Sequence, residues 1–224
     1  MKLTIIGKYG PYPREGGATS GYLIEGKGAK IMLDFGSGVL SRIDGYSAPE
    51  KLDAIVLSHT HYDHCADLLT LSYRLKEKLP LYMPAHQQNG LASVIISTGA
   101  YSTCEYDEGD EIRIGALTLT FARMPHPVTS YAIRITDGEK VFVYTGDTTY
   151  CEALTDFCRG ADVILADAMQ KDGFVGPHMT VNQAKTLAIE CGAQVICTHE
   201  PPQNAGDPTK LGLTQAEEGK SYEI

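Results

Sequence analysis

Four potential metal ligands, His59, His61, Asp63 and His64, fall within six residues of this sequence. They form an H-x-H-x-D-H run that directly follows the apolar segment 53–58, which is predicted to be a strand. Imidazoles and carboxylates are the ligands that suit zinc, manganese or iron. A structural purpose for such a cluster is hard to find. The leading hypothesis is therefore a metal-dependent enzyme.

Three further candidate ligands, His126, Asp147 and His199, each come shortly after a predicted strand. Loops at strand ends are where α/β proteins hold ligands and catalytic groups. Because all three occupy the same kind of position, they are predicted to join the cluster in one metal centre. His86 begins a helix-like segment and has no partner motif, so it is interpreted as an ordinary polar residue.

The elements that must position these groups are mostly strands. Predicted strands cover residues 3–6, 21–25, 30–34, 54–57, 81–83, 112–114, 117–121, 131–136, 140–144, 163–165 and 194–197, with a short one near Tyr222. Predicted helices cover residues 39–43, 66–79, 85–97 and 181–190. Strands followed by helices, twice over, favour a four-layer α/β arrangement with two packed sheets and outer helices. Residues 1–224 are expected to form one domain, with the metal centre where its halves meet.

Composition excludes several classes of function. The 224 residues are 43% hydrophobic and 21% charged, which is ordinary for a soluble globular protein. The formal net charge is −9 and no basic block is present, which disfavours binding of long nucleic acids. The six cysteines show no CxxC spacing, and neither a signal peptide nor a membrane-spanning segment is evident. We expect a cytoplasmic protein with free thiols and no membrane contact.

The cluster, a later histidine, a G-D-T aspartate and a strand-end histidine together resemble the metallo-β-lactamase superfamily over essentially the whole chain. The resemblance implies an αββα sandwich with a dinuclear site between its halves, and a homodimer. It implies two divalent metal ions, zinc first, with manganese or iron as alternatives. The positions that match the ligands are His59, His61 and His126 for one ion, Asp63, His64 and His199 for the other, and Asp147 between them.

Individual residues refine this resemblance. Asp34, in a D-F-G-S-G turn, matches a family position behind the ligands, where it would accept a hydrogen bond from a ligand histidine. Residue 147 is Asp, where antibiotic-degrading lactamases have Cys. Residue 61 is His, where the di-iron oxidoreductase branch has Glu. Both observations favour a hydrolase. Cys65 is expected to face the helix core rather than the metals.

Asp167 and His178 resemble the acid–histidine pair of the ribonuclease Z-like branch, in which the histidine lies near the scissile phosphate. Asp167 stands where that branch usually has Glu, so its side chain is one methylene shorter. The long Gly- and Pro-rich arm that grips tRNA in that branch has no counterpart here, because segment 167–180 is too short to hold it. We therefore expect a small hydrolase rather than a tRNA-processing enzyme.

Three functions follow in order of preference. The first is a phosphodiesterase on a small or short phosphodiester, with a metal-bridging hydroxide as nucleophile, Asp63 orienting it and His178, paired with Asp167, as the proton donor. The second is a hydrolase of a carbonyl substrate such as a lactone, thioester or lactam, with Tyr12, Tyr62 or Tyr150 stabilising the oxyanion. The third, least favoured, is a non-catalytic metal-binding regulatory protein.

Overall fold

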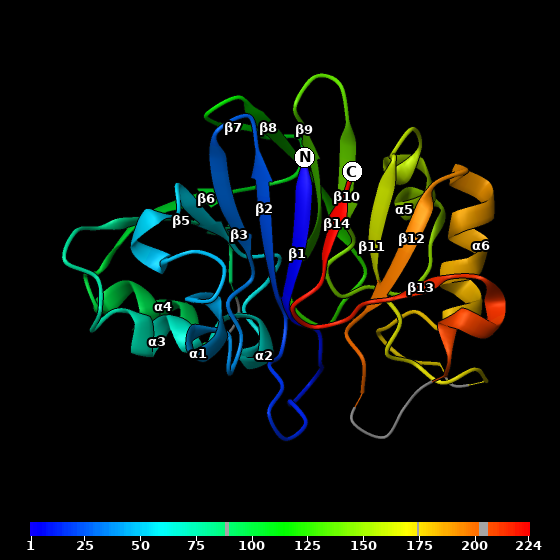
Figure 1. The fold of residues 1–224 in the computed structure, drawn as a ribbon, viewed down its shortest axis with the longest axis horizontal. Coiled ribbons are helices and arrows are strands. Elements are labelled where there is room, and N and C mark those ends of the chain that lie inside the picture. Colours follow the sequence, from blue (N-terminus) through cyan, green and yellow to red (C-terminus); the bar gives the residue numbers. More distant parts are fainter. Residues whose placement is uncertain (88–89, 174, 202–205) are drawn as a thin grey trace.

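Two seven-stranded sheets packed face to face form the centre of the molecule (Figure 1). The computed structural model describes residues 1–87, 90–173, 175–201 and 206–224. Helices cover the outer face of each sheet, so the chain is arranged in four layers. The prediction of an αββα sandwich is confirmed.

The first sheet contains the N-terminal strands and the last strand of the chain. Its order is β14 (Ser221–Glu223), β1 (Lys2–Gly7), β2 (Gly21–Gly26), β3 (Ala29–Leu33), β4 (Ala54–Val56), β5 (Leu79–Pro84) and β6 (Tyr101–Tyr106). Strands β14 to β3 are antiparallel, whereas β3 to β6 run parallel. The His-rich run follows β4, which lies inside the parallel part of the sheet.

The second sheet has the same plan in the second half of the chain. Its order is β13 (Thr214–Gln215), β12 (Gln194–Thr198), β11 (Val163–Asp167), β10 (Val141–Tyr144), β9 (Ser130–Thr136), β8 (Leu117–Met124) and β7 (Glu111–Ile114). Strands β7 to β10 are antiparallel and β10 to β13 are parallel. Because parallel strands end at the same edge, residues that follow β10, β11 and β12 come together there.

Helices pack on the outside through apolar faces. The first sheet carries α1 (Leu40–Ile43), α2 (Tyr62–Cys65), α3 (Asp67–Leu71) and α4 (Gly90–Ser97), and the second carries α5 (Glu152–Cys158) and α6 (Val181–Cys191). Helix α6 begins with a capping box, in which the Thr180 hydroxyl accepts from the Gln183 amide and the Gln183 side chain accepts from the Thr180 amide. Within the described residues, no helix combines the length and apolar character needed to cross a membrane.

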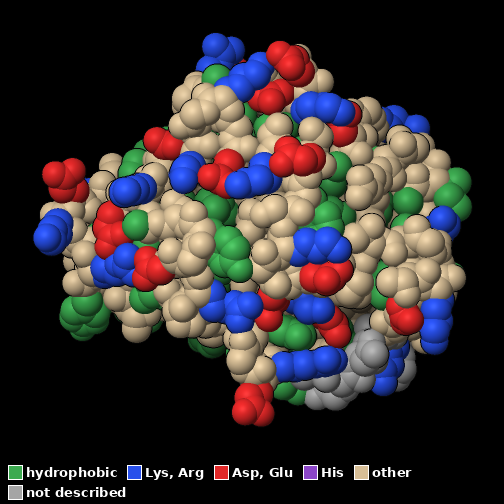
Figure 2. All heavy atoms as spheres, viewed as in Figure 1, with side chains coloured by type: hydrophobic (Ala, Val, Ile, Leu, Met, Phe, Trp, Pro, Cys, Tyr) green, Lys and Arg blue, Asp and Glu red, His purple; other side chains and the backbone are tan. Residues whose placement is uncertain are grey.

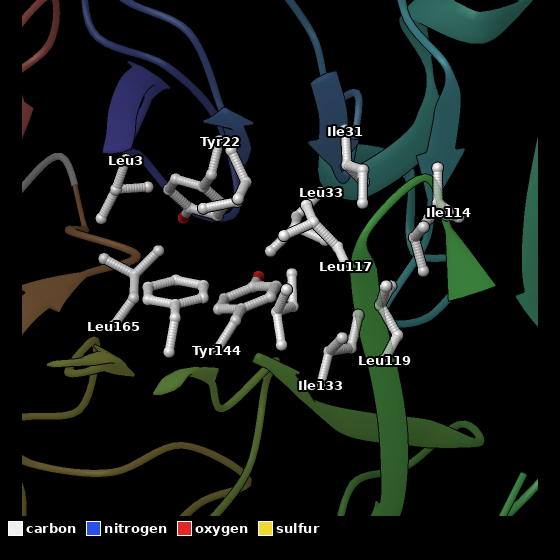
Figure 3. Close-up of a cluster of buried hydrophobic side chains, with 14 of the residues drawn as sticks. Leu3, Tyr22, Ile31, Leu33, Ile114, Leu117, Leu119, Ile133, Tyr144 and Leu165 are labelled. Atoms are coloured by element: carbon white, nitrogen blue, oxygen red, sulfur yellow. The ribbon is translucent and has the colours of Figure 1, made fainter. Parts of the chain in front are cut away.

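The core between the sheets is built from strand positions that alternate inward and outward. Leu33 and Tyr22 of the first sheet face Leu119 and Tyr144 of the second, as Figure 3 shows. All four are buried. Apolar side chains of both sheets thus share one layer, and its burial supplies the main force that holds the sheets together.

The structure corrects part of the helix prediction. The helix expected over residues 66–79 ends at Leu71, and Leu79 and Pro80 instead begin β5, where they pair with Tyr101 and Ser102. Pro80 is tolerated because pairing with β4 begins only at Leu81, after the position without an amide hydrogen. In the region predicted as helix 85–97, residues 85–87 are not helical, 88–89 lie outside the described residues, and α4 begins at Gly90.

Among the described residues, two α-helices and two strands have no counterpart in the prediction: α2, α5, β6 and β13. In β6 the four central residues are exposed, so the strand lacks the apolar alternation that identifies a half-buried strand. Helix α5 contains seven residues and β13 only two, lengths at which periodicity is a weak signal.

Replacing Leu119 by Ala should lower the free energy of unfolding by about 2–5 kcal/mol, because it leaves a cavity between the sheets. Urea denaturation followed by circular dichroism measures this change. As a control, Val94→Ala on the half-exposed face of α4 should alter stability by no more than about 0.5 kcal/mol. Equal effects of the two substitutions would contradict the assignment of Leu119 to the shared core.

Candidate metal centre

Seven side chains that the sequence singled out as candidate ligands lie together at one edge of the sandwich. They come from loops that follow β4, β8, β10 and β12 and from the short helix α2. Their metal-binding atoms fall into overlapping groups in which all atoms lie within 4.8 Å of one another. Residues 140 positions apart in the chain therefore meet, because the two sheets present their strand ends at the same edge.

The first group contains His59, His61 and His126. His59 Nε2 lies 3.0 Å from His61 Nδ1, which in turn lies 3.2 Å from His126 Nε2. Two nitrogens that bind one tetrahedral zinc ion at about 2.0–2.1 Å are separated by about 3.3 Å. The spacing of these nitrogens therefore fits a shared divalent cation.

The second group contains Asp63, His64 and His199. His64 Nε2 and His199 Nε2 are 3.2 Å apart, and Asp63 Oδ2 lies 3.1 Å from the His199 nitrogen. The same oxygen is 3.6 Å from His64 Nε2. These three atoms thus have the spacing expected for ligands of a second cation.

Asp147 stands between the two groups. Its Oδ2 lies 3.6 Å from His59 Nε2 in the first group, and 3.3 and 3.4 Å from His64 Nε2 and His199 Nε2 in the second. Its Oδ1 is buried and has no hydrogen-bond partner within the part of the chain that the structure describes. A buried carboxylate oxygen without a donor is costly, and a bound cation would satisfy it. The donor set fits two divalent metal ions.

Burial also sets the protonation states of the three histidines in the first group. It lowers the pKa of His59 well below its usual value, lowers that of His61, and lowers the pKa of His126 to about 4. These imidazoles are therefore neutral at pH 7 and have a free lone pair. Burial would raise the pKa of Asp147, but the neighbouring histidines, above all His199, hold it well below its usual range.

Asp167 and His178 form a hydrogen-bonded pair beside the second group. His178 Nδ1 donates to Asp167 Oδ2 over 2.8 Å, so the shorter acid still reaches the histidine. Asp167 is itself fixed by the backbone amides of Thr148 and Met169. Burial would lower the pKa of His178, but the Asp167 carboxylate outweighs it and raises the pKa to about 9. His178 Nδ1 lies 3.8 Å from Asp147 Oδ2, so the pair adjoins the metal ligands.

Comparison with known proteins shows to which family this chain belongs. The family model of the Beta-lactamase superfamily domain matches residues 34–199, which span the whole set of candidate ligands. The chain belongs to the metallo-β-lactamase superfamily. Membership of this superfamily implies divalent metal binding, in agreement with the His and Asp cluster.

Individual relatives within the superfamily cover most of the chain. The probable metallo-hydrolase YhfI of Bacillus subtilis is 36% identical over 214 residues, which cover 90% of this chain and 87% of that protein. Its crystal structure superposes with a TM-score of 0.90 at 33% identity, covering 99% of both chains. A ribonuclease Z of Mycobacterium bovis is 26% identical over 243 residues, covering 90% of this chain and 86% of the relative. A diphosphatase of the PhnP family shares the fold with a TM-score of 0.80 at 18% identity, covering 100% and 96% of the chains.

Asp34 links the ligands of this superfamily site to the sheets behind them. Its Oδ2 accepts hydrogen bonds from His64 Nδ1 at 2.7 Å and from the Ser58 and Tyr144 hydroxyls at 2.8 Å each. Ser58 Oγ in turn lies 3.0 Å from His59 Nδ1. Because Nδ1 of both histidines carries the donated proton, each Nε2 keeps its lone pair for the metal.

Two of these supporting residues were not identified from the sequence. Ser58 directly precedes the cluster, and a polar residue at that position is only a weak indication of a role in supporting the ligands. Tyr144 lies 110 positions from Asp34 and reads as an ordinary core residue of a strand. Asp34 itself has a φ of +57°, a left-handed conformation that Asp and Asn adopt more readily than other non-glycine residues.

The structure also places the other residues that were considered in the sequence. His86 is exposed and belongs to none of the metal-binding groups formed by the described residues, as predicted. Cys65 is buried in the helix-side core, which confirms its expected orientation. The Tyr150 hydroxyl donates to Glu190 on α6 at 2.6 Å, so it is not directed at the metal centre and the suggestion that it stabilises an oxyanion is wrong. Tyr12 and Tyr62 are exposed.

Asp34→Asn should weaken metal binding by about 10–100-fold, because it removes the charged acceptor that orients His64 while keeping a residue that tolerates the left-handed backbone. Competition with a chromogenic chelator measures the affinity. Asp156→Asn, at an exposed ion pair with Arg159, should leave it unchanged. Unaltered affinity of the Asp34 variant would show that the hydrogen bonds to Asp34 do not support the site.

Proposed function

We propose that this chain is a dinuclear metal-dependent phosphodiesterase that acts on a small or short phosphodiester. The observation that carries the proposal is the position of Asp147 Oδ2 within reach of both ligand groups, with the Asp167–His178 pair beside them. The proposed ligands are His59, His61 and His126 for one ion, Asp63, His64 and His199 for the other, and Asp147 as the bridge.

The donor types support zinc as the resident metal. Five of the seven proposed ligands are imidazoles and two are carboxylates, with no thiolate among them. Imidazole-rich sites suit zinc, whereas sites rich in carboxylate suit harder ions such as manganese. Manganese or iron would be accommodated by the same atoms when zinc is scarce.

The chain's own residues account for the remaining steps of hydrolysis. When bound, two divalent ions neutralise phosphate charge and lower the pKa of water. Asp63, with one carboxylate oxygen at the second group, would orient the attacking water. His178 would donate a proton from Nε2 to the leaving alkoxide, because its Nδ1 is engaged by Asp167. Asp167 thus acts on the reaction by orienting His178.

The relatives support phosphate chemistry. One is named a ribonuclease and another a diphosphatase. The net charge of −9 and the mixed distribution of Lys, Arg, Asp and Glu on the face shown in Figure 2 favour a small or short substrate over a long nucleic acid.

The first experiment measures hydrolysis of bis(p-nitrophenyl) phosphate by protein loaded with zinc or manganese, with and without a chelator. We expect turnover that the chelator abolishes, and its loss in Asp147→Ala, because both ligand groups share that carboxylate. Two bound metal ions without turnover of the diester, together with turnover of a lactone or thioester, would refute the proposal in favour of a carbonyl hydrolase.

His178→Ala should lower kcat/KM by about 10²–10⁴-fold for a diester with an alkyl leaving group, because the alkoxide must be protonated as it leaves. A p-nitrophenolate leaving group needs little protonation, so its release should change far less. Parallel assays of the two substrates measure the difference between the two losses. His86→Ala, at an exposed residue, is the control. Equal losses on both substrates would exclude His178 as the proton donor.

A further inference from the structure

His199 differs from three other histidines of the centre in how its ring is held. Its Nδ1 is buried and has no hydrogen-bond partner within the described part of the chain. The Asp167 carboxylate is 3.8 Å away, beyond hydrogen-bond distance. The other three have an acceptor for the nitrogen that faces away from the metal: Ser58 Oγ for His59, Asp34 Oδ2 for His64 and the Pro177 carbonyl for His126.

The backbone of His199 also adopts a conformation that needs support. Its φ is +56°, in the left-handed region that few residues other than glycine favour. A residue in this region keeps its conformation only where the surrounding structure enforces it. Hydrogen bonding does not fix the ring through Nδ1, so contacts with neighbouring segments must hold both backbone and ring.

Gly10 lies close against the His199 ring. A methyl group at its Cβ position would lie 2.1 Å from His199 Nε2 and 2.2 Å from Cε1, far inside normal contact distance. The backbone of the loop between β1 and β2 therefore lies directly against the imidazole, next to the proposed ligand atom. Only glycine allows this approach.

Glu200 fastens that loop to the strand end that carries His199. Its backbone carbonyl accepts from the Gly10 amide at 3.2 Å, and its own amide donates to the Lys8 carbonyl at 2.8 Å. Its carboxylate binds Lys8 Nζ through one oxygen and Arg14 Nη2, at 3.2 Å, through the other. In Figure 1 the loop after β1 projects below the sheets beside the segment that follows β12.

The ion pair between Lys8 and Glu200 is shielded from water. The two side chains are only 12% and 14% exposed, and Gln215 Nε2 donates to the same carboxylate at 3.4 Å. Such a pair is screened less by solvent than an exposed one and holds its partners more firmly. The loop and the residue after His199 therefore behave as one fixed unit.

We infer that Glu200 is a positioning residue for the second metal ion, which acts by clamping Gly10 against the His199 ring through Lys8 and Arg14. The inference rests on the proposed two-ion centre. It goes beyond it because the ligands of the two ions are held in position by different residues. Among the described residues, no hydrogen bond or ion pair joins His59, His61 or His126 to the loop, and His59 and His126 are oriented by other acceptors. Loss of the clamp should therefore weaken the Asp63–His64–His199 site selectively.

Glu200→Gln keeps the size of the side chain and removes its charge. Calorimetric zinc titration of the metal-free protein should show two ions bound by the unmodified chain and the second bound about tenfold more weakly by the variant. Lys8→Met should give the same selective loss, and the double variant no more than either single one, because both changes break the same interaction. Glu111→Gln, at an exposed ion pair on β7, is the control and should bind like the unmodified chain.

Each outcome of this titration is informative. Two ions bound with unchanged affinity by Glu200→Gln, or equal weakening of both ions, would overturn the inference while leaving the two-ion centre intact. Fewer than two ions on the unmodified chain would overturn the proposed centre, and the inference with it. The thermal midpoint of each metal-free variant, measured by circular dichroism, separates a local effect from general unfolding.

Gly10→Ala tests the steric part of the clamp. The added methyl group must displace the His199 ring or the loop, so we expect selective loss of the second ion by more than about tenfold. Gly90→Ala is a matched control, since a Cβ there would come within 4 Å of nothing in the described part of the chain and the residue has no positive φ. Equal zinc affinities of Gly10→Ala and Gly90→Ala would contradict the proposed contact.

Discussion

Polar groups that are removed from water must be satisfied by one another or by a ligand, and this requirement governs the edge of the sandwich where the metal centre lies. Five imidazoles and two carboxylates meet there within a few ångströms. Asp34 accepts four hydrogen bonds there, one from the His64 ring, two from Ser58 and one from Tyr144. Asp147 Oδ1 is left without a partner among the described residues. Without a bound cation, this buried carboxylate oxygen has no partner.

The apolar core and this polar edge depend on each other. Tyr144 packs between the sheets through its ring and donates its hydroxyl to Asp34 of the opposite sheet. Tyr22 does the reverse, since it belongs to the first sheet and its hydroxyl lies 2.9 Å from that of Thr198, next to His199. Two buried tyrosines therefore connect sheet packing with ligand position. These two hydrogen bonds form only within a narrow range of distances, so they restrict how the two sheets can sit relative to each other.

The sequence predicted the fold class and the metal cluster because both leave local signals. The run from His59 to His64 concentrates ligands in one place, and strand ends mark Asp147 and His199. The supporting network leaves no such signal, because Tyr144 and Asp34 are brought together only by the docking of the two sheets. The predicted helix over 66–79 failed for a related reason, since leucine spacing there fits a helix as well as a turn followed by β5. The clamp on His199 joins Lys8 to Glu200 across 192 positions and is equally invisible in local patterns.

Because the chain is made from its N-terminus, the two ligand groups become complete at different times during synthesis. The histidines of the first group are all present once residue 126 has been made, whereas the second group is complete only when His199 has been made. The nascent chain therefore holds one set of histidines long before the other. In the proposed two-ion centre, the second ion could bind only after His199 has been made. Because a ligand that binds only the native state stabilises it by mass action, the second ion of the proposed centre would add stability only after His199 has joined the fold.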